Sequence, residues 1–210
     1  MREQVEKCLR ETGIVAIARH LAPEFVCDLA DALHAGGVEM LEVTMNTEGA
    51  AEMIRTLRSH CEGKMYVGAG TVTDLARLDA AAAAGAQFIV TPNLEEDVVR
   101  RCEEMDLLVL PGVMTPTEIC RAMALGCRYM KLFPAGALGA AYMKAVLAPL
   151  SEAKLIAVGG IDSTNLAEFL AVGAVGAGVG GSLCGMKSRA DAEKITCEAK
   201  NLRALCSQTV

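Results

Sequence analysis

Eight short apolar runs alternate with segments of helical pattern along the whole chain, and this alternation limits the folds that the chain can adopt. The runs cover residues 14–19, 40–45, 65–72, 88–93, 107–113, 129–134, 155–161 and 176–182. Such alternation is typical of right-handed βαβ units, in which helices bury parallel strands on both faces. Eight of these units in one chain predict a TIM barrel.

Helix boundary signals support the same units. Capping residues stand before three of the expected helices, at Asp74, Thr115 and Asp162, and a glycine follows the far end of each. We therefore expect an α/β fold, a single-domain (β/α)8 TIM barrel over residues 1–210 with an N-terminal helix. A doubly wound sheet with fewer strands is the alternative. It would carry a glycine-rich turn after its first strand, and residues 17–20 contain no glycine.

Charge and cysteine content exclude several classes of protein. The net charge of −6 argues against binding to nucleic acid or to an anionic membrane, so any bound anion needs a local site. The nine cysteines lack the close spacing of zinc or redox motifs, and we expect reduced thiols that pack as small apolar side chains. The polar N-terminus and the lack of an apolar run of roughly 20 residues predict a cytoplasmic protein without a signal peptide.

Charged residues interrupt the apolar runs where a barrel offers no bulk water. Lys131 alternates with apolar neighbours and shares one face of its strand with Phe133. Burial lowers the pKa of a lysine and makes the amine nucleophilic, as imine formation with a ketone requires. Glu42 lies similarly within the second run, where a carboxylate can carry protons. Arg19 ends the first run and could clamp a carboxylate or phosphate.

Simpler explanations of these charges remain open at this point. Lys131 could extend its ammonium group to solvent at a strand end. Glu42 and Arg19 could form a buried ion pair without any catalytic role. Thr71 adds a hydroxyl at the glycine-rich end of the third run, which is weak evidence alone.

The last two runs end in glycines, where barrels commonly bind phosphate through backbone N–H groups. These residues are Gly159, Gly160, Gly180, Gly181 and Ser182. Tight turns alone could explain either cluster, but they explain both together less well. We find no His, Cys or carboxylate set with metal-ligand spacing and no nucleophile elbow. We therefore expect no bound metal ion, so the imine itself would serve as the electron sink.

Five ordered motifs then show a family resemblance over essentially the whole chain. They are Leu-Glu-Val-Thr at 41–44, Gly-Ala-Gly-Thr-Val at 68–72, the segment 111–118, Lys-Leu-Phe-Pro at 131–134 and Gly-Gly at 159–160. The chain resembles the bacterial 2-keto-3-deoxy-6-phosphogluconate (KDPG) and 4-hydroxy-2-oxoglutarate (KHG) aldolases, which are class I pyruvate aldolases. The resemblance implies a lyase on a TIM barrel, usually a homotrimer, without metal or organic cofactor.

The resemblance also implies roles for individual residues. Lys131 matches the Schiff-base lysine, and Glu42 matches a general acid/base that works through a water. Thr71 matches a contact to the pyruvate portion, and Pro92 a residue that lines the pocket. The glycines and Ser182 fall where the family binds phosphate. Arg19 is our candidate for holding the pyruvate carboxylate.

Two departures leave the substrate epimer open. The phosphogluconate branch commonly carries Arg at the position of Asn46 and often Thr at the position of Val158. These two residues, together with Arg19 and Thr91-Pro92-Asn93, look more like the 2-keto-3-deoxy-6-phosphogalactonate branch. Met114, Thr115 and the Gly-Gly-Ser that ends at Ser182 look more like the phosphogluconate branch. We expect the phosphogluconate activity, with the galactonate epimer as alternative. A phosphosugar epimerase or isomerase on the same barrel, or a phosphosugar-binding protein without catalysis, would keep the glycines but need no covalent lysine.

Overall fold

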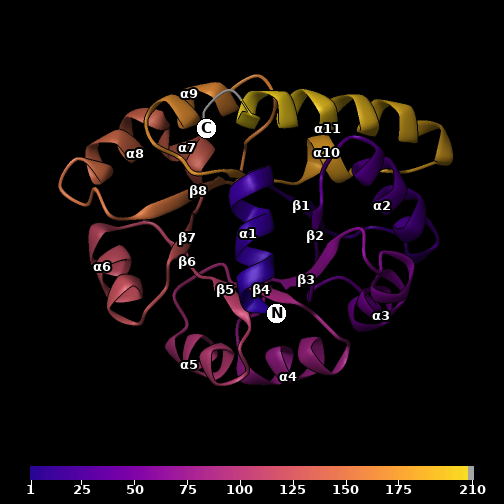
Figure 1. Ribbon diagram of the computed structural model, residues 1–210, viewed down its shortest axis with the longest axis horizontal. Coiled ribbons are helices and arrows are strands. Elements are labelled where there is room, and N and C mark those ends of the chain that lie inside the picture. The colour runs from indigo at the N-terminus through magenta and orange to yellow at the C-terminus, as the bar shows by residue number, and fades with distance from the viewer. Residues whose placement is uncertain (208–210) are drawn as a thin grey trace.

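The computed structural model describes residues 1–207. A single sheet of nine strands forms its core, and helices lie around this sheet (Figure 1). The strands are β1 (Ile14–Ala18), β2 (Met40–Thr44), β3 (Tyr66–Gly70), β4 (Phe88–Val90), β5 (Leu108–Leu110), β6 (Gly112–Val113), β7 (Tyr129–Leu132), β8 (Lys154–Val158) and β9 (Ala177–Val179). Their order is β5-β4-β3-β2-β1-β9-β8-β7-β6, and every neighbouring pair is parallel.

The two ends of this sheet belong to one stretch of chain, which closes the barrel. Pro111 separates β5 from β6, and the two short strands pair with opposite neighbours, β4 and β7. Proline has no N–H to donate to a ladder, so it breaks the strand here. The Pro111 carbonyl still accepts a hydrogen bond of 2.8 Å from the backbone N–H of Lys131. The predicted eight-unit barrel is confirmed, with its fifth strand interrupted at Pro111.

Helices surround the barrel (Figure 1). They are α1 (Arg2–Thr12), α2 (Val26–Ala35), α3 (Ala50–His60), α4 (Leu75–Ala83), α5 (Glu96–Glu104), α6 (Pro116–Ala124), α7 (Ala135–Leu138), α8 (Ala140–Leu147), α9 (Leu166–Ala171), α10 (Gly181–Cys184) and α11 (Ala192–Ser207), with short 3-10 turns at Pro23–Phe25 and Arg189–Asp191.

Two of the three predicted helix starts are confirmed. The Asp74 carboxylate accepts a hydrogen bond of 2.8 Å from the Arg77 N–H, and Thr115 forms a reciprocal capping box with Glu118. The third is wrong, because α9 begins only at Leu166. The Asp162 carboxylate instead accepts the N–H and hydroxyl of Thr164, which folds a turn before the helix.

Helix α1 closes the N-terminal end of the barrel, as its central place in Figure 1 shows. Its buried residues Val5, Cys8 and Leu9 belong to the same apolar cluster as Met40 and Tyr129, which point into the barrel. A second, larger cluster lies between the outer face of the strands and the surrounding helices. Because α1 thus covers the barrel interior at this end, Lys131 and Glu42 can be reached only from the carboxyl ends of the strands, the usual place of a binding site in such barrels.

The cysteines are used as the sequence predicts. All nine fall within the described residues and are free thiols, and most are buried. Within residues 1–207, no helix is both long and apolar enough to cross a membrane.

Candidate active site

Lys131 lies in the barrel interior, two residues beyond Tyr129 on β7. Its side chain is only 4% exposed, and its Nζ lies 4.9 Å from the centre of the Phe133 ring. Burial lowers the pKa of Lys131, and the positive charge of Arg19 lowers it further, while Glu42 acts in the opposite direction. The predicted burial of this lysine is confirmed, so the alternative of an ammonium group in solvent is wrong.

Glu42 occupies the corresponding position on β2, two residues beyond the interior residue Met40. It is 1% exposed, and burial raises the pKa of its carboxyl to about 7, although the charges of Lys131 and Arg19 partly oppose this rise. Its Oε2 is buried and has no hydrogen-bond partner within residues 1–207. Neither cation pairs with Glu42 at ion-pair distance in this part of the chain. A simple buried ion pair with Arg19 therefore does not describe the site.

The absence of a side chain at Gly70 makes room for this carboxylate. A Cβ atom at Gly70, which pairs with Thr44 across β2 and β3, would lie 2.2 Å from Glu42 Oε1 and 2.7 Å from its Cδ. Such distances are far below van der Waals contact. Gly70 thus fixes where the Glu42 carboxylate can lie.

A very small cavity joins the two ionisable residues. Its volume is about 10 Å³, and Lys131 and Glu42 both line it together with apolar side chains of the barrel interior. A space of this size accommodates about one water molecule. Proton exchange between the amine and the carboxylate through one water is therefore geometrically possible.

A second cavity of about 490 Å³ opens at the carboxyl ends of β1, β7, β8 and β9. It brings together Lys131 and most of the other residues that the sequence singled out. They are Arg19, Phe133, Val158, Gly159, Gly160, Gly180, Gly181 and Ser182. Such a cavity fits a small substrate, with the lysine at its wall.

Four candidate residues do not line this cavity: Glu42, which lines only the small void, and three residues of neighbouring strand ends. Asn46 is exposed after β2, Thr71 is half-buried after β3, and Pro92 is half-buried after β4. Thr71 has a φ of 56°, an uncommon left-handed conformation for a threonine that places it at a sharp turn. All three follow carboxyl ends of strands, so they lie at the same end of the barrel as the cavity but on its other side.

The glycines of the cavity wall have conformations or positions that a side chain would disturb. Gly159 has a φ of 91°, and a Cβ there would lie 2.9 Å from the Phe133 ring. Gly160 follows with a φ of 73°. Across the cavity, α10 begins at Gly181, and the first N–H groups of a helix have no acceptor within it. Together these backbone segments can accept a small anion.

Several residues of the site were not found by sequence reasoning. His20, Asp162 and Cys184 also line the cavity. His20 directly follows Arg19 and has a φ of 52°, with its N–H bonded to the Thr47 hydroxyl at 3.0 Å. Its position next to Arg19 in the sequence could have identified His20 as a residue of the site. The sequence around Cys184 does not distinguish it from the other cysteines. Burial raises the pKa of the Cys184 thiol to about 12, so this thiol is unreactive.

This geometry defines a class of protein: a parallel α/β barrel with a buried lysine and a buried carboxyl group of raised pKa, beside a cavity at the carboxyl ends of the strands. No group of three or more His, Cys, Asp or Glu side chains within residues 1–207 could hold a metal ion. The family model described as KDPG and KHG aldolase matches residues 5–197. The chain therefore belongs to this family and is an aldolase, which is a type of lyase.

Individual relatives support the same assignment. The chain is 35% identical to the 2-dehydro-3-deoxy-6-phosphogalactonate aldolase of Escherichia coli, over 81% of this chain and 83% of that protein. It is 37% identical to the 2-dehydro-3-deoxy-phosphogluconate aldolase of Treponema pallidum, over 79% of each. Among solved structures, a Legionella pneumophila KDPG aldolase with pyruvate captured as a covalent carbinolamine is similar, with a TM-score of 0.86 and 26% identity over 93% of this chain and 96% of that chain.

Proposed function

We propose that this chain reversibly cleaves 2-keto-3-deoxy-6-phosphogluconate to pyruvate and glyceraldehyde 3-phosphate through an imine on Lys131. The amine attacks the keto carbon, and loss of water gives a protonated imine. Glu42 takes the proton from the C4 hydroxyl, and the C3–C4 bond breaks as its electrons move into the imine. Glyceraldehyde 3-phosphate leaves. The remaining enamine is reprotonated and hydrolysed to pyruvate.

One observation carries this proposal: a lysine that is 4% exposed faces the substrate-sized cavity and shares a one-water void with a buried carboxylate. Burial lowers the pKa of Lys131 and raises that of Glu42 to about 7. The lowered pKa of Lys131 increases the share of free amine that can act as nucleophile, and a carboxyl group with a pKa of about 7 can both give and accept a proton near neutral pH. The covalent pyruvate species named for the Legionella relative is consistent with such an amine.

The cavity walls suggest how the substrate is oriented. Arg19 would hold the pyruvate carboxylate, and Phe133 would cover the imine carbon, since its ring already contacts the Lys131 ammonium group. Thr71 and Pro92 would complete the pyruvate pocket from the opposite strands. The phosphate would lie against the N–H groups of Gly159 and Gly160 on one side, and of residues 180–182 on the other. Pyruvate and glyoxylate would form similarly from 4-hydroxy-2-oxoglutarate, without the phosphate contacts.

The galactonate epimer is the second candidate, and Val158 is the observation that favours it. Val158 lines both the substrate cavity and the void beside Lys131, so it offers a methyl group where a threonine would offer a hydroxyl. A site without one hydroxyl partner can change its discrimination between epimers substantially. Comparing kcat/KM for the two epimers, in the native protein and in Val158→Thr, tests this. A shift toward the gluconate epimer in the variant would support the role of Val158.

Replacing the lysine separates an aldolase from an isomerase. Lys131→Ala should lose all measurable aldol cleavage in a coupled assay that follows pyruvate, because no imine can form. Lys144→Ala, which removes an exposed lysine of α8, should keep full activity. Substantial cleavage by folded Lys131→Ala protein would contradict the imine mechanism. Epimerisation of a phosphosugar by the native protein, only weakened in Lys131→Ala, would favour the isomerase.

We also propose that residues 1–210 are one domain that acts as a cytoplasmic homotrimer. The nine free thiols suit a reducing compartment. Leu75 follows β3 and Met114 follows β6, and these two residues are 44% and 42% exposed. Both lie at the carboxyl-terminal end of the barrel and offer apolar contacts to another copy. Sedimentation velocity should give a single species of three chains, and a monomer at micromolar concentration would contradict the assembly.

A further inference from the structure

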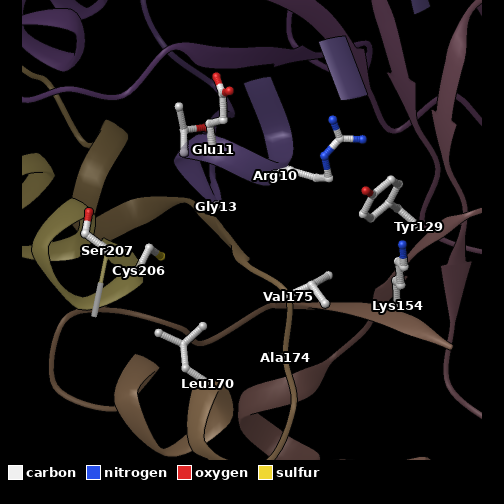
Figure 2. A pocket seen from close by; sticks show the side chains of 11 residues that line it. Arg10, Glu11, Gly13, Tyr129, Lys154, Leu170, Ala174, Val175, Cys206 and Ser207 are labelled. Carbon is white, nitrogen blue, oxygen red and sulfur yellow. The ribbon is translucent and has the colours of Figure 1, made fainter. Parts of the chain in front are cut away.

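A larger cavity lies at the opposite end of the barrel from Lys131. Its volume is about 710 Å³, and helix α1, the starts of β7 and β8, the turn before β9 and the end of α11 form its walls (Figure 2). Strand β7 connects the two ends, because Tyr129 lines this cavity and Lys131 lines the substrate cavity two residues later. None of the steps proposed above uses a residue of this second cavity.

Three hydrogen-bond donors point toward one region of this cavity. The Tyr129 side chain is 3% exposed, yet its hydroxyl points into the cavity and makes no hydrogen bond to any of residues 1–207 (Figure 2). Arg10 and Lys154 extend toward the same ring, with the Lys154 Nζ 5.4 Å from its centre, and neither forms an ion pair in this part of the chain. The hydroxyl is open to the cavity and is not enclosed by protein, so it is free to donate a hydrogen bond to a bound ligand. Its orientation here therefore points to a ligand that accepts hydrogen bonds.

The charges around this point are positive. Glu11 is the acidic residue of the cavity wall, and its carboxylate points away from the three donors and contacts Lys7 at 3.8 Å (Figure 2). A guanidinium, an ammonium and a phenol hydroxyl together match a carboxylate, which accepts several charge-assisted hydrogen bonds. The anionic group of a ligand should therefore lie between α1 and β8.

The opposite wall of the cavity is apolar. Leu170, Ala174, Val175 and Cys206 form it (Figure 2), and Val175 is 38% exposed. A ligand that covers this wall gains from removing apolar surface from water. We propose that the N-terminal end of the barrel binds a small organic carboxylate with an apolar body, its carboxylate at Arg10, Tyr129 and Lys154.

Calorimetric titration with three probes tests the ligand class. Octanoate has both features, octan-1-ol has the chain without the charge, and inorganic phosphate has charge without the chain. Octanoate should bind saturably at one site per chain and more tightly than either other probe. Equal affinity for octan-1-ol would overturn the carboxylate contact, and equal affinity for phosphate would overturn the role of the apolar wall.

Variants locate the site and separate it from the substrate cavity. Tyr129→Phe and Arg10→Ala should each weaken octanoate binding by about tenfold, because each removes a hydrogen bond to a charged group. Lys64→Ala is the control, because it removes the positive charge of an exposed residue outside this cavity. It should leave octanoate binding unchanged. Lys131→Ala should also bind octanoate normally, whether or not Lys131 is catalytic. Native affinity in both cavity variants, or loss of binding in Lys131→Ala, would overturn the proposal.

Discussion

Gly70 offers a test of the claim that the position of the Glu42 carboxylate controls the reaction. In Gly70→Ala, the new methyl carbon would lie 2.2 Å from Oε1, whereas ordinary contacts begin at 3.4 Å. The carboxylate must therefore retreat by about 1 Å, within a barrel interior that leaves Glu42 only 1% exposed. A catalytic group misplaced by about 1 Å costs roughly 10²-fold in rate, which corresponds to about 2.7 kcal/mol in activation free energy.

The assay is steady-state cleavage of the phosphorylated substrate, with pyruvate followed by a coupled reduction. We expect kcat for Gly70→Ala to fall about 10²-fold, while borohydride still traps pyruvate on Lys131, because the amine itself is undisturbed. Circular dichroism and the unfolding midpoint establish how much of the variant is folded.

A double-mutant cycle gives the decisive comparison. In a Glu42→Ala background there is no carboxylate to displace, so adding Gly70→Ala should change the residual rate by less than about threefold. Two results would refute the reasoning: a single variant within about threefold of native kcat, or an equal loss in both backgrounds. The second result would mean that the added methyl acts by distorting the barrel.

The other predictions concern ionisation and substrate contacts. The pKa of Glu42 is about 7 in the folded chain, above the roughly 4.3 of an unfolded one. The contribution of Glu42 to stability is therefore full below about pH 4 and is lost as the pH rises through 7. Urea titrations should show this loss. Between pH 5 and 8, the unfolding free energy of the native protein should fall by about 3 kcal/mol relative to that of Glu42→Gln. A constant difference would contradict the raised pKa. Ser182→Ala should raise KM for the phosphorylated substrate about tenfold and leave KM for 4-hydroxy-2-oxoglutarate unchanged. An equal rise in KM for the two substrates would exclude a phosphate contact at Ser182. Arg19→Ala should weaken pyruvate binding by at least about tenfold. The measurement is the pyruvate concentration that gives half-maximal inactivation by borohydride. If this concentration is unchanged in the variant, Arg19 does not contact the carboxylate.

Much of the fold follows from local pattern. Parallel strands that are buried on both faces appear in the sequence as apolar runs. A charged residue within such a run is costly to bury, so it stands out from its neighbours. For this reason Lys131 and Glu42 could be identified from the sequence. The break at Pro111 also has a local cause, but whether a proline ends a strand or only interrupts it depends on the pairing partners, here β4 and β7.

Other features depend on contacts between distant residues. The space that Gly70 leaves for Glu42 is visible only once β2 and β3 are in register. The distribution of Asn46, Thr71 and Pro92 on the far side of the substrate cavity depends on the curvature of the barrel. The cavity at Tyr129 combines residues of α1 with residues close to the C-terminus of the described chain. No local sequence motif predicts that these distant segments lie side by side.

Trapping the imine tests the central claim most directly. The protein is incubated with pyruvate, reduced with borohydride, digested and analysed by mass spectrometry. The account predicts one pyruvyl adduct, located on Lys131, together with loss of aldolase activity in proportion to the adduct. Folded protein that carries no adduct on any lysine, or an adduct on a lysine other than Lys131 that accompanies inactivation, would contradict it.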